Sequence, residues 1–213
     1  VFTIEALFTT ITNVNFDSNK IKELIIEADK LKTKAKELYL KAAKEKNIEI
    51  EKLPEEIVDF KPALDIENLK LQALEHTFDK DIARFGETVA GLYHLILYGL
   101  KGTAAYADHA KILGVGDDDV YMFFHEAMNF LAENNHNEGD LLMMALKVGE
   151  INFKVMEMLD KANTGNYGHP IPTKVRITPV KGKAILISGH DLKDLEHLLK
   201  QTEGKDINIY THG

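Results

Sequence analysis

Two histidines stand where apolar segments end in the last part of the sequence. His190 follows the run AILIS at 184–188, and His212 follows the run INIYT at 207–211. In open parallel sheets, ligands bind outside the carboxyl ends of the strands. A neutral imidazole there can act as a metal ligand or as a general base. The alternative is that His190 only shapes a turn and His212 lies in a loop.

The residues between the two runs indicate how these histidines are positioned. Residues 191–202 have a helical pattern that Gly204 ends, so the order is strand, helix, strand, which is typical of one βαβ unit with parallel strands. Asp191 is the expected N-cap of that helix, although Asp191 or Asp194 could instead orient the imidazole of His190. The turn SGHD lacks the glycine spacing of a phosphate-binding loop, so a nucleotide ligand is not expected. A further strand is predicted at 174–178.

The first two-thirds of the chain is predicted to be helical. Residues 18–47 repeat apolar side chains every 3.6 residues after an N-cap at Asp17 or Ser18, and helical patterns return at 64–76, 82–113, 117–134 and 138–164. We therefore predict a helical domain over 1–168 and the start of an α/β domain over 169–213. The helix glycines predict close helix packing, at Gly86, Gly91, Gly99 and Gly102. The other histidines, His94, His109 and His125, have no metal-ligand spacing and are expected to be packed or exposed.

Composition restricts the function further. The chain has 213 residues with 45% hydrophobic and 28% charged residues, and its net charge of −8 argues against a nucleic-acid-binding surface. No run of apolar residues is long enough for a membrane span, no signal peptide is visible, and a cytoplasmic location is expected. The sequence has no cysteine, which removes thiolate ligands and disulfides from this segment.

One βαβ unit does not complete a parallel sheet, whose two faces both need cover. We therefore expect the sequence to be an internal fragment of a longer protein. The uncovered strands should be covered by the helical domain or by a second copy of the chain through self-association.

Several stretches resemble the hybrid-cluster protein family, also called prismane proteins or hydroxylamine reductases. They are TTITNVNFDS, LYGLKGTAAYADHAKILG, INFKVMEMLDKANTGNYGHPIPTKV, KGKAILISGHDLKDLEHLLKQTEG and NIYTHG, and together they extend from Phe2 to Gly213. The resemblance implies a helical domain of the three-helix-bundle type, followed by the first βαβ unit of a parallel, Rossmann-like α/β domain. It also implies two cofactors in the parent protein, a cubane iron–sulfur cluster and a hybrid iron–sulfur–oxygen cluster.

The resemblance assigns one ligand to this chain. The family's histidine ligand falls in the SGHD turn, so His190 is the predicted cofactor-binding and metal-binding residue. His212 is expected in the strand-end loop that carries the next ligand, a glutamate beyond Gly213. The cluster cysteines lie outside the sequence, so no cluster is expected to bind to this segment alone, and no catalytic residue is assigned.

The function implied is an iron–sulfur oxidoreductase that receives electrons from an electron-donor protein. Its small-molecule substrate would be hydroxylamine, reduced to ammonia and water, or nitric oxide, reduced to nitrous oxide, and the segment alone should be inactive. One alternative is a non-catalytic helical interaction module with a small α/β appendage. Another is a relative of carbon monoxide dehydrogenase, which also supplies a histidine to its cluster.

Overall fold

The chain forms two compact units. The computed structural model describes residues 1–11, 16–50, 55–133, 135, 137–189 and 191–212. Unit 1 contains Val1–Ala105 and Asp117–Phe153, and unit 2 contains Tyr106–Gly116 and Lys154–Gly213. The ends of two long helices therefore belong with the α/β segment rather than with the other helices.

The described part of the chain before residue 168 is mostly helical, with short turns and connecting segments between the helices. Its elements are α1 (Phe2–Thr9), α2 (Ser18–Lys46), α3 (Glu55–Val58), α4 (Ile66–Ala73), the 3₁₀ turn η1 (Leu74–His76), α5 (Phe78–Phe85), α6 (Glu87–Ile112), α7 (Asp118–Glu133) and α8 (Glu138–Tyr167). This confirms the prediction of a mainly helical first part. Helix α2 begins as expected, because the carboxylate of Asp17 accepts hydrogen bonds from the first-turn N–H groups of Asn19 and Lys20.

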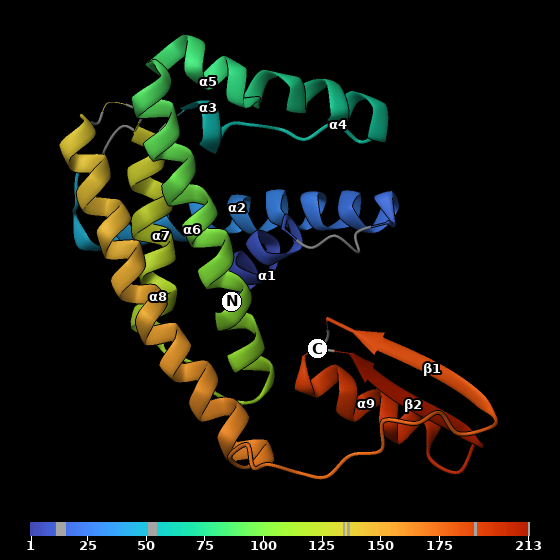
Figure 1. Ribbon diagram of the computed structural model, residues 1–213. Coiled ribbons are helices and arrows are strands. Elements are labelled where there is room, and N and C mark those ends of the chain that lie inside the picture. Colours follow the sequence, from blue (N-terminus) through green and yellow to red (C-terminus); the bar gives the residue numbers. More distant parts are fainter. Residues whose placement is uncertain (12–15, 51–54, 134, 136, 190, 213) are drawn as a thin grey trace. The chain divides into compact units, whose positions relative to one another are not determined.

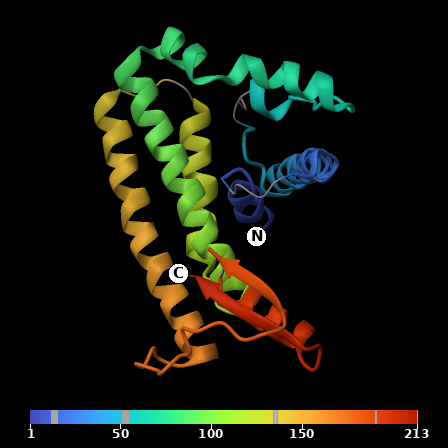
Figure 2. The same cartoon turned by 45° about the vertical axis from the view of Figure 1, so that its right-hand side comes forward.

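In unit 1, helices α6, α7 and α8 run side by side in both views (Figures 1 and 2). The side chain of Thr103 on α6 donates to Asn152 Oδ1 on α8 at 3.1 Å. The core of the unit is apolar and small-residue-rich, and α1 lies against α7. Its buried hydrophobic residues are Ile4, Leu7, Ala43, Ala90, Ile96, Leu100, Ala104, Ala105, Val120, Phe123, Phe124, Ala127, Leu131, Leu141 and Val148.

Two predicted helix bounds and one predicted strand are wrong. The helix expected over 82–113 is broken at Gly86, which has φ 81° and ends α5, a conformation that glycine adopts without strain. Helix α8 continues through Gly165 and ends before Gly168. The strand predicted at 174–178 is absent, because this described segment pairs with no strand and leaves Ile177 92% exposed.

The prediction of close helix packing at the glycines is confirmed only at Gly99. A Cβ added at Gly99 would lie 3.0 Å from Val148 Cγ1 on α8. At Gly91 and Gly102, nothing lies within 4 Å of an added Cβ. Gly86 terminates a helix instead, so its role is conformational.

Unit 2 contains the predicted βαβ unit. Strand β1 (Lys183–Ser188) and strand β2 (Ile207–His212) are parallel neighbours, and α9 (Leu192–Thr202) connects them. Figure 1 shows α9 running along one face of this pair. On β1, Ile185 and Ile187 are partly buried, but Leu186 is 70% exposed. Part of the sheet therefore stays uncovered in this chain, as expected of a single βαβ unit.

Among the residues that the structure describes, no helix combines the length and the apolar character that crossing a membrane requires.

Candidate functional site

The carboxyl ends of the two strands meet at one edge of the sheet. The parallel register pairs Ser188 with His212. The Ser188 Oγ lies 3.1 Å from His212 Nδ1, and both side chains are exposed. His212 is thus the last residue of β2, not part of a loop after the strand. The spatial relation of the two strand ends follows from the pairing register.

The turn after β1 is shaped by the residues on either side of position 190. Gly189 has φ 62°, in the left-handed region that favours glycine, and nothing lies within 4 Å of a Cβ added there. Asp191 has extended backbone angles, and its Oδ1 accepts a hydrogen bond from the N–H of Asp194 at 2.8 Å. The prediction that Asp191 is the N-cap of α9 is therefore confirmed. His190 itself lies outside the described residues.

Two carboxylates and two imidazoles gather at the start of α9. His109, near the end of α6, has its Nε2 3.8 Å from Asp191 Oδ2. Partial burial raises the pKa of the Asp194 carboxyl, and the negative charge of Asp191 adds to this effect. The imidazoles of His109 and His197 oppose the increase. This corner of unit 2 thus carries acidic and basic groups in close proximity.

The contact between His109 and Asp191 was not predicted from the sequence. The residue was expected to be packed or exposed, and nothing in the spacing of the sequence relates it to Asp191. The same expectation is confirmed for the other two histidines. His94 pairs with Asp81 at 2.7 Å, and His125 is exposed.

Glu196 anchors α9 to the end of α8. Its carboxylate accepts a hydrogen bond from the Tyr167 hydroxyl at 2.8 Å and pairs with Lys193 and Lys200. Hydrogen bonds from Lys200, Lys193 and Tyr167 lower the pKa of Glu196 to about 2. Loss of solvation, together with the hydrogen bond to Glu196, raises the pKa of Tyr167 to about 12. These contacts hold the helix that follows the candidate turn.

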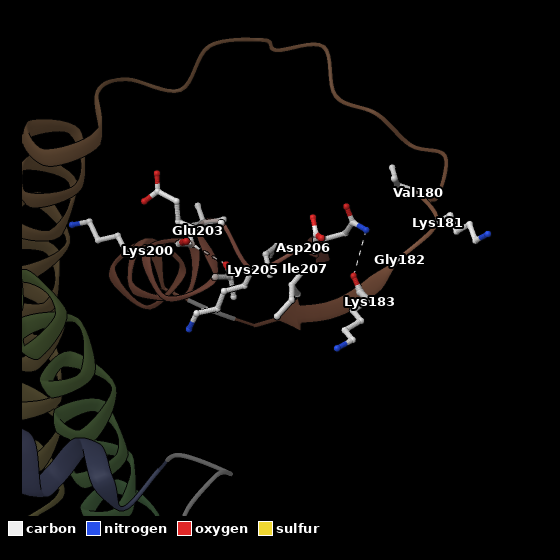
Figure 3. Close-up of a pocket in the computed structure, with 14 residues that line it drawn as sticks. Val180, Lys181, Gly182, Lys183, Lys200, Glu203, Lys205, Asp206 and Ile207 are labelled. Carbon is white, nitrogen blue, oxygen red and sulfur yellow. Dashed lines mark hydrogen bonds between the residues drawn. The ribbon is translucent and has the colours of Figure 1, made fainter.

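An open hollow lies at the opposite edge of the sheet, where the strands begin. Its volume is about 1370 Å³, and the lysines that line it are Lys181, Lys183, Lys200 and Lys205. Figure 3 shows the ends of these four side chains apart from one another, so the ammonium groups do not converge on one point. Because its lining residues lie at the start of the strands, the hollow is separate from the strand ends where His212 lies.

The described residues do not form an iron–sulfur site by themselves. Cysteine thiolates are the usual ligands of such clusters, and the sequence has no cysteine. Within the described ranges, no group of three or more His, Asp or Glu side chains is arranged to hold a metal ion. The donors at the strand ends can supply single nitrogen or oxygen ligands to a larger site.

Comparison with known proteins gives the relationship of the chain. A model of the Prismane/CO dehydrogenase family matches residues 1–213. The chain belongs to the Prismane/CO dehydrogenase family. A hydroxylamine reductase of Syntrophobacter fumaroxidans is 49% identical over 217 residues, which cover 100% of this chain and 38% of the relative. Hydroxylamine reductases of Thermodesulfovibrio yellowstonii and Escherichia coli O9:H4 are 47% and 44% identical, over 37% and 38% of their lengths.

This prismane-family chain therefore spans less than two-fifths of the length of the curated relatives that it matches. The predicted resemblance is confirmed over the whole of the sequence.

Proposed function

We propose that this chain is part of a hydroxylamine reductase-type iron–sulfur oxidoreductase. The observation that carries the proposal is the match of the entire chain to proteins of that name at 44–49% identity. The reaction proposed is the two-electron reduction of hydroxylamine, which with two protons gives ammonia and water. Two-electron reduction of two nitric oxide molecules to nitrous oxide and water is the alternative reaction.

The cofactors belong to the whole protein in this proposal. A cubane cluster and a hybrid iron–sulfur–oxygen cluster would supply the redox chemistry, and the polypeptide would bind and tune them. Without cysteine, this chain cannot provide their thiolates. We therefore expect the 213 residues alone to hold no cluster and to be inactive. We also propose that the whole protein receives electrons from a donor protein, which a pull-down with the full-length protein would test. A cytoplasmic location is part of the same proposal, and cell fractionation tests it.

His190 is the proposed iron ligand of this chain. The support is its place after a parallel strand, at the edge where ligands bind in such sheets, between Gly189 and the helix cap Asp191. Imidazole is a suitable ligand for iron. Within the described ranges, no three His, Asp or Glu side chains are arranged to hold a metal ion, and the proposal assigns the remaining ligands to other parts of the whole protein.

Iron and acid-labile sulfide analysis of the full-length protein, prepared without oxygen, tests the function. We expect both elements, together with hydroxylamine-dependent oxidation of a reduced electron donor. Absence of iron and sulfide would end the proposal. Preference for nitric oxide over hydroxylamine in kcat/KM would favour the alternative reaction.

A substitution at position 190 tests the ligand. His190→Ala in the full-length protein should deplete or alter the hybrid cluster and lower turnover by orders of magnitude. The cubane signal should stay, because its ligands lie elsewhere, and electron paramagnetic resonance separates the two clusters. His169→Ala is the matched control, since His169 is exposed in the loop before β1. An unchanged hybrid-cluster signal in His190→Ala would show that His190 is not a ligand.

The finer architecture is also part of the proposal. The side-by-side helices of unit 1 suit a domain of the three-helix-bundle type, and the β1–α9–β2 unit suits the start of a Rossmann-like domain. We place the domain boundary after residue 168, because α8 ends at Tyr167. Exposed Leu186 on β1 supports self-association of the 213-residue chain. A strictly monomeric mass in light scattering would exclude it.

A further inference from the structure

A contact within unit 2 joins the end of α6 to the start of α9. His109 Nε2 lies 3.8 Å from Asp191 Oδ2, and the two side chains are 27% and 26% exposed. Both residues belong to the same compact unit. The contact is therefore partly shielded from water, where polar groups interact more strongly than on an open surface.

The carboxylate of Asp191 has two separate roles. Its Oδ1 accepts the hydrogen bond from the Asp194 N–H at 2.8 Å, which caps α9, while its Oδ2 faces His109. The backbone carbonyl of Asp191 also accepts a hydrogen bond from the N–H of Leu195 at 3.2 Å. Whatever fixes the side chain of Asp191 therefore also fixes the first turn of the helix.

The neighbouring charges explain why this carboxylate needs a partner. Burial raises the pKa of the Asp194 carboxyl, the negative charge of Asp191 and a side-chain hydrogen bond to it add to this effect, and the imidazoles of His109 and His197 act in the opposite direction. Without His109, the Oδ2 atom of Asp191 would lose the group that faces it from α6. His109 on α6 supplies an imidazole that faces the Asp191 carboxylate.

We propose that His109 is a positioning residue that acts through Asp191. By holding the Asp191 carboxylate, His109 fixes the start of α9 and the exit of the turn whose entry is set by Gly189. The turn carries position 190, so in its consequence for iron this inference rests on the proposed function. The positioning of α9 does not depend on iron.

Hydrogen exchange of the full-length protein tests the positioning. His109→Ala should speed exchange of the amides of Asp194 and Leu195 by about two- to fivefold, the range expected for loss of one partly exposed polar contact. His109→Gln should restore the slower exchange, because its amide can reach the same carboxylate. The matched control His125→Ala removes an exposed histidine of α7 and should leave these amides unchanged.

Repeating the His109→Ala substitution in an Asp191→Ser variant tests whether His109 acts through Asp191. Asp191→Ser keeps a capping oxygen but removes the carboxylate that faces His109. In that background, His109→Ala should have no further effect on exchange at α9. Unchanged exchange in the single variant, failure of His109→Gln to restore it, or equal acceleration in both backgrounds would each overturn the inference.

A spectroscopic measurement connects the positioning to the proposed ligand. In the full-length holoprotein, His109→Ala should broaden or shift the electron paramagnetic resonance signal of the hybrid cluster and leave the cubane signal unchanged. His109→Gln should recover the original signal. An unaltered hybrid-cluster signal in His109→Ala, in a protein that contains the cluster, would overturn the link to the ligand turn. Full-length protein without iron or sulfide would instead overturn the proposed function, and the exchange experiment would still decide the role of His109.

Discussion

Alanine substitutions at two glycines of α6 should differ in their effects on stability. Gly99 and Gly102 are both in the interior of the helix, one turn apart. A Cβ at position 99 would lie 3.0 Å from Val148 Cγ1, whereas a Cβ at position 102 has nothing within 4 Å. The pair therefore separates helix propensity from packing.

The magnitude follows from two terms. Alanine in a helix interior is more favourable than glycine by about 0.5–1 kcal/mol, and this gain applies at both positions. Overpacking a core contact costs about 1–3 kcal/mol, and this cost applies only at Gly99, because Val148 is buried against it. Gly102→Ala should therefore raise the free energy of unfolding, and Gly99→Ala should lower it or leave it unchanged.

Thermal unfolding of the 213-residue chain measures the difference. For a chain of this size, about 1 kcal/mol changes Tm by about 2–4 °C. The double variant Gly99→Ala with Val148→Ala should lose less stability than the sum of the single variants, because the smaller side chain makes room for the new methyl group.

Two results would refute this reasoning. Equal Tm changes for Gly99→Ala and Gly102→Ala would show that the contact with Val148 has no energetic weight. Additive effects in the double variant would show that the two positions are not coupled.

Three further predictions concern the core, a helix cap and pH. Phe124→Ala should lower the free energy of unfolding by about 3–5 kcal/mol, because the side chain is 0% exposed, whereas Phe153→Ala, at a side chain 64% exposed, should have little effect in urea unfolding. Asp17→Ala should cost about 1 kcal/mol, since it removes the acceptor for two first-turn amides of α2, and urea unfolding followed by circular dichroism measures the loss. Lys200 and its neighbours lower the pKa of Glu196 from 4.5 to about 2, so the stabilisation is complete above about pH 4.5 and is lost as pH falls toward 2. In Glu196→Gln, the urea midpoint should change less with pH over that interval.

Each of these three predictions has a result that would contradict it. Similar losses for the two phenylalanine variants would contradict the burial assigned to α7. An unchanged stability in Asp17→Ala would show that the cap is not formed in solution. A pH profile of Glu196→Gln that parallels the original chain would place the acid-sensitive group elsewhere.

Local sequence determined the elements whose signals are local. The 3.6-residue period of 18–47 and the side chain of Asp17 define where α2 lies and begins. The same is true of α9, where Asp191 provides the cap and the residues on either side give the strand–helix–strand order. Each depends on contacts within one helical turn, which adjacent residues alone can specify.

Elements that need a distant partner were predicted less well. Residues 174–178 alternate β-branched side chains, but a strand forms only when a neighbouring strand accepts and donates its backbone hydrogen bonds. The described structure offers no such neighbour, and Val175 and Ile177 are exposed. At Gly86, the choice between a continuous helix and a break depended on φ 81°, which the sequence permits but does not require.

The candidate site shows the same division. The sequence pattern indicated the strand ends and the cap Asp191, and the family resemblance predicted His190 as a ligand. Only the tertiary structure decided that Ser188 and His212 share a register position, and that His109 faces Asp191 from another helix. The physical reason is that register and interhelical contacts join residues far apart in the chain, so their geometry follows from packing of whole elements and not from the pattern of neighbouring residues.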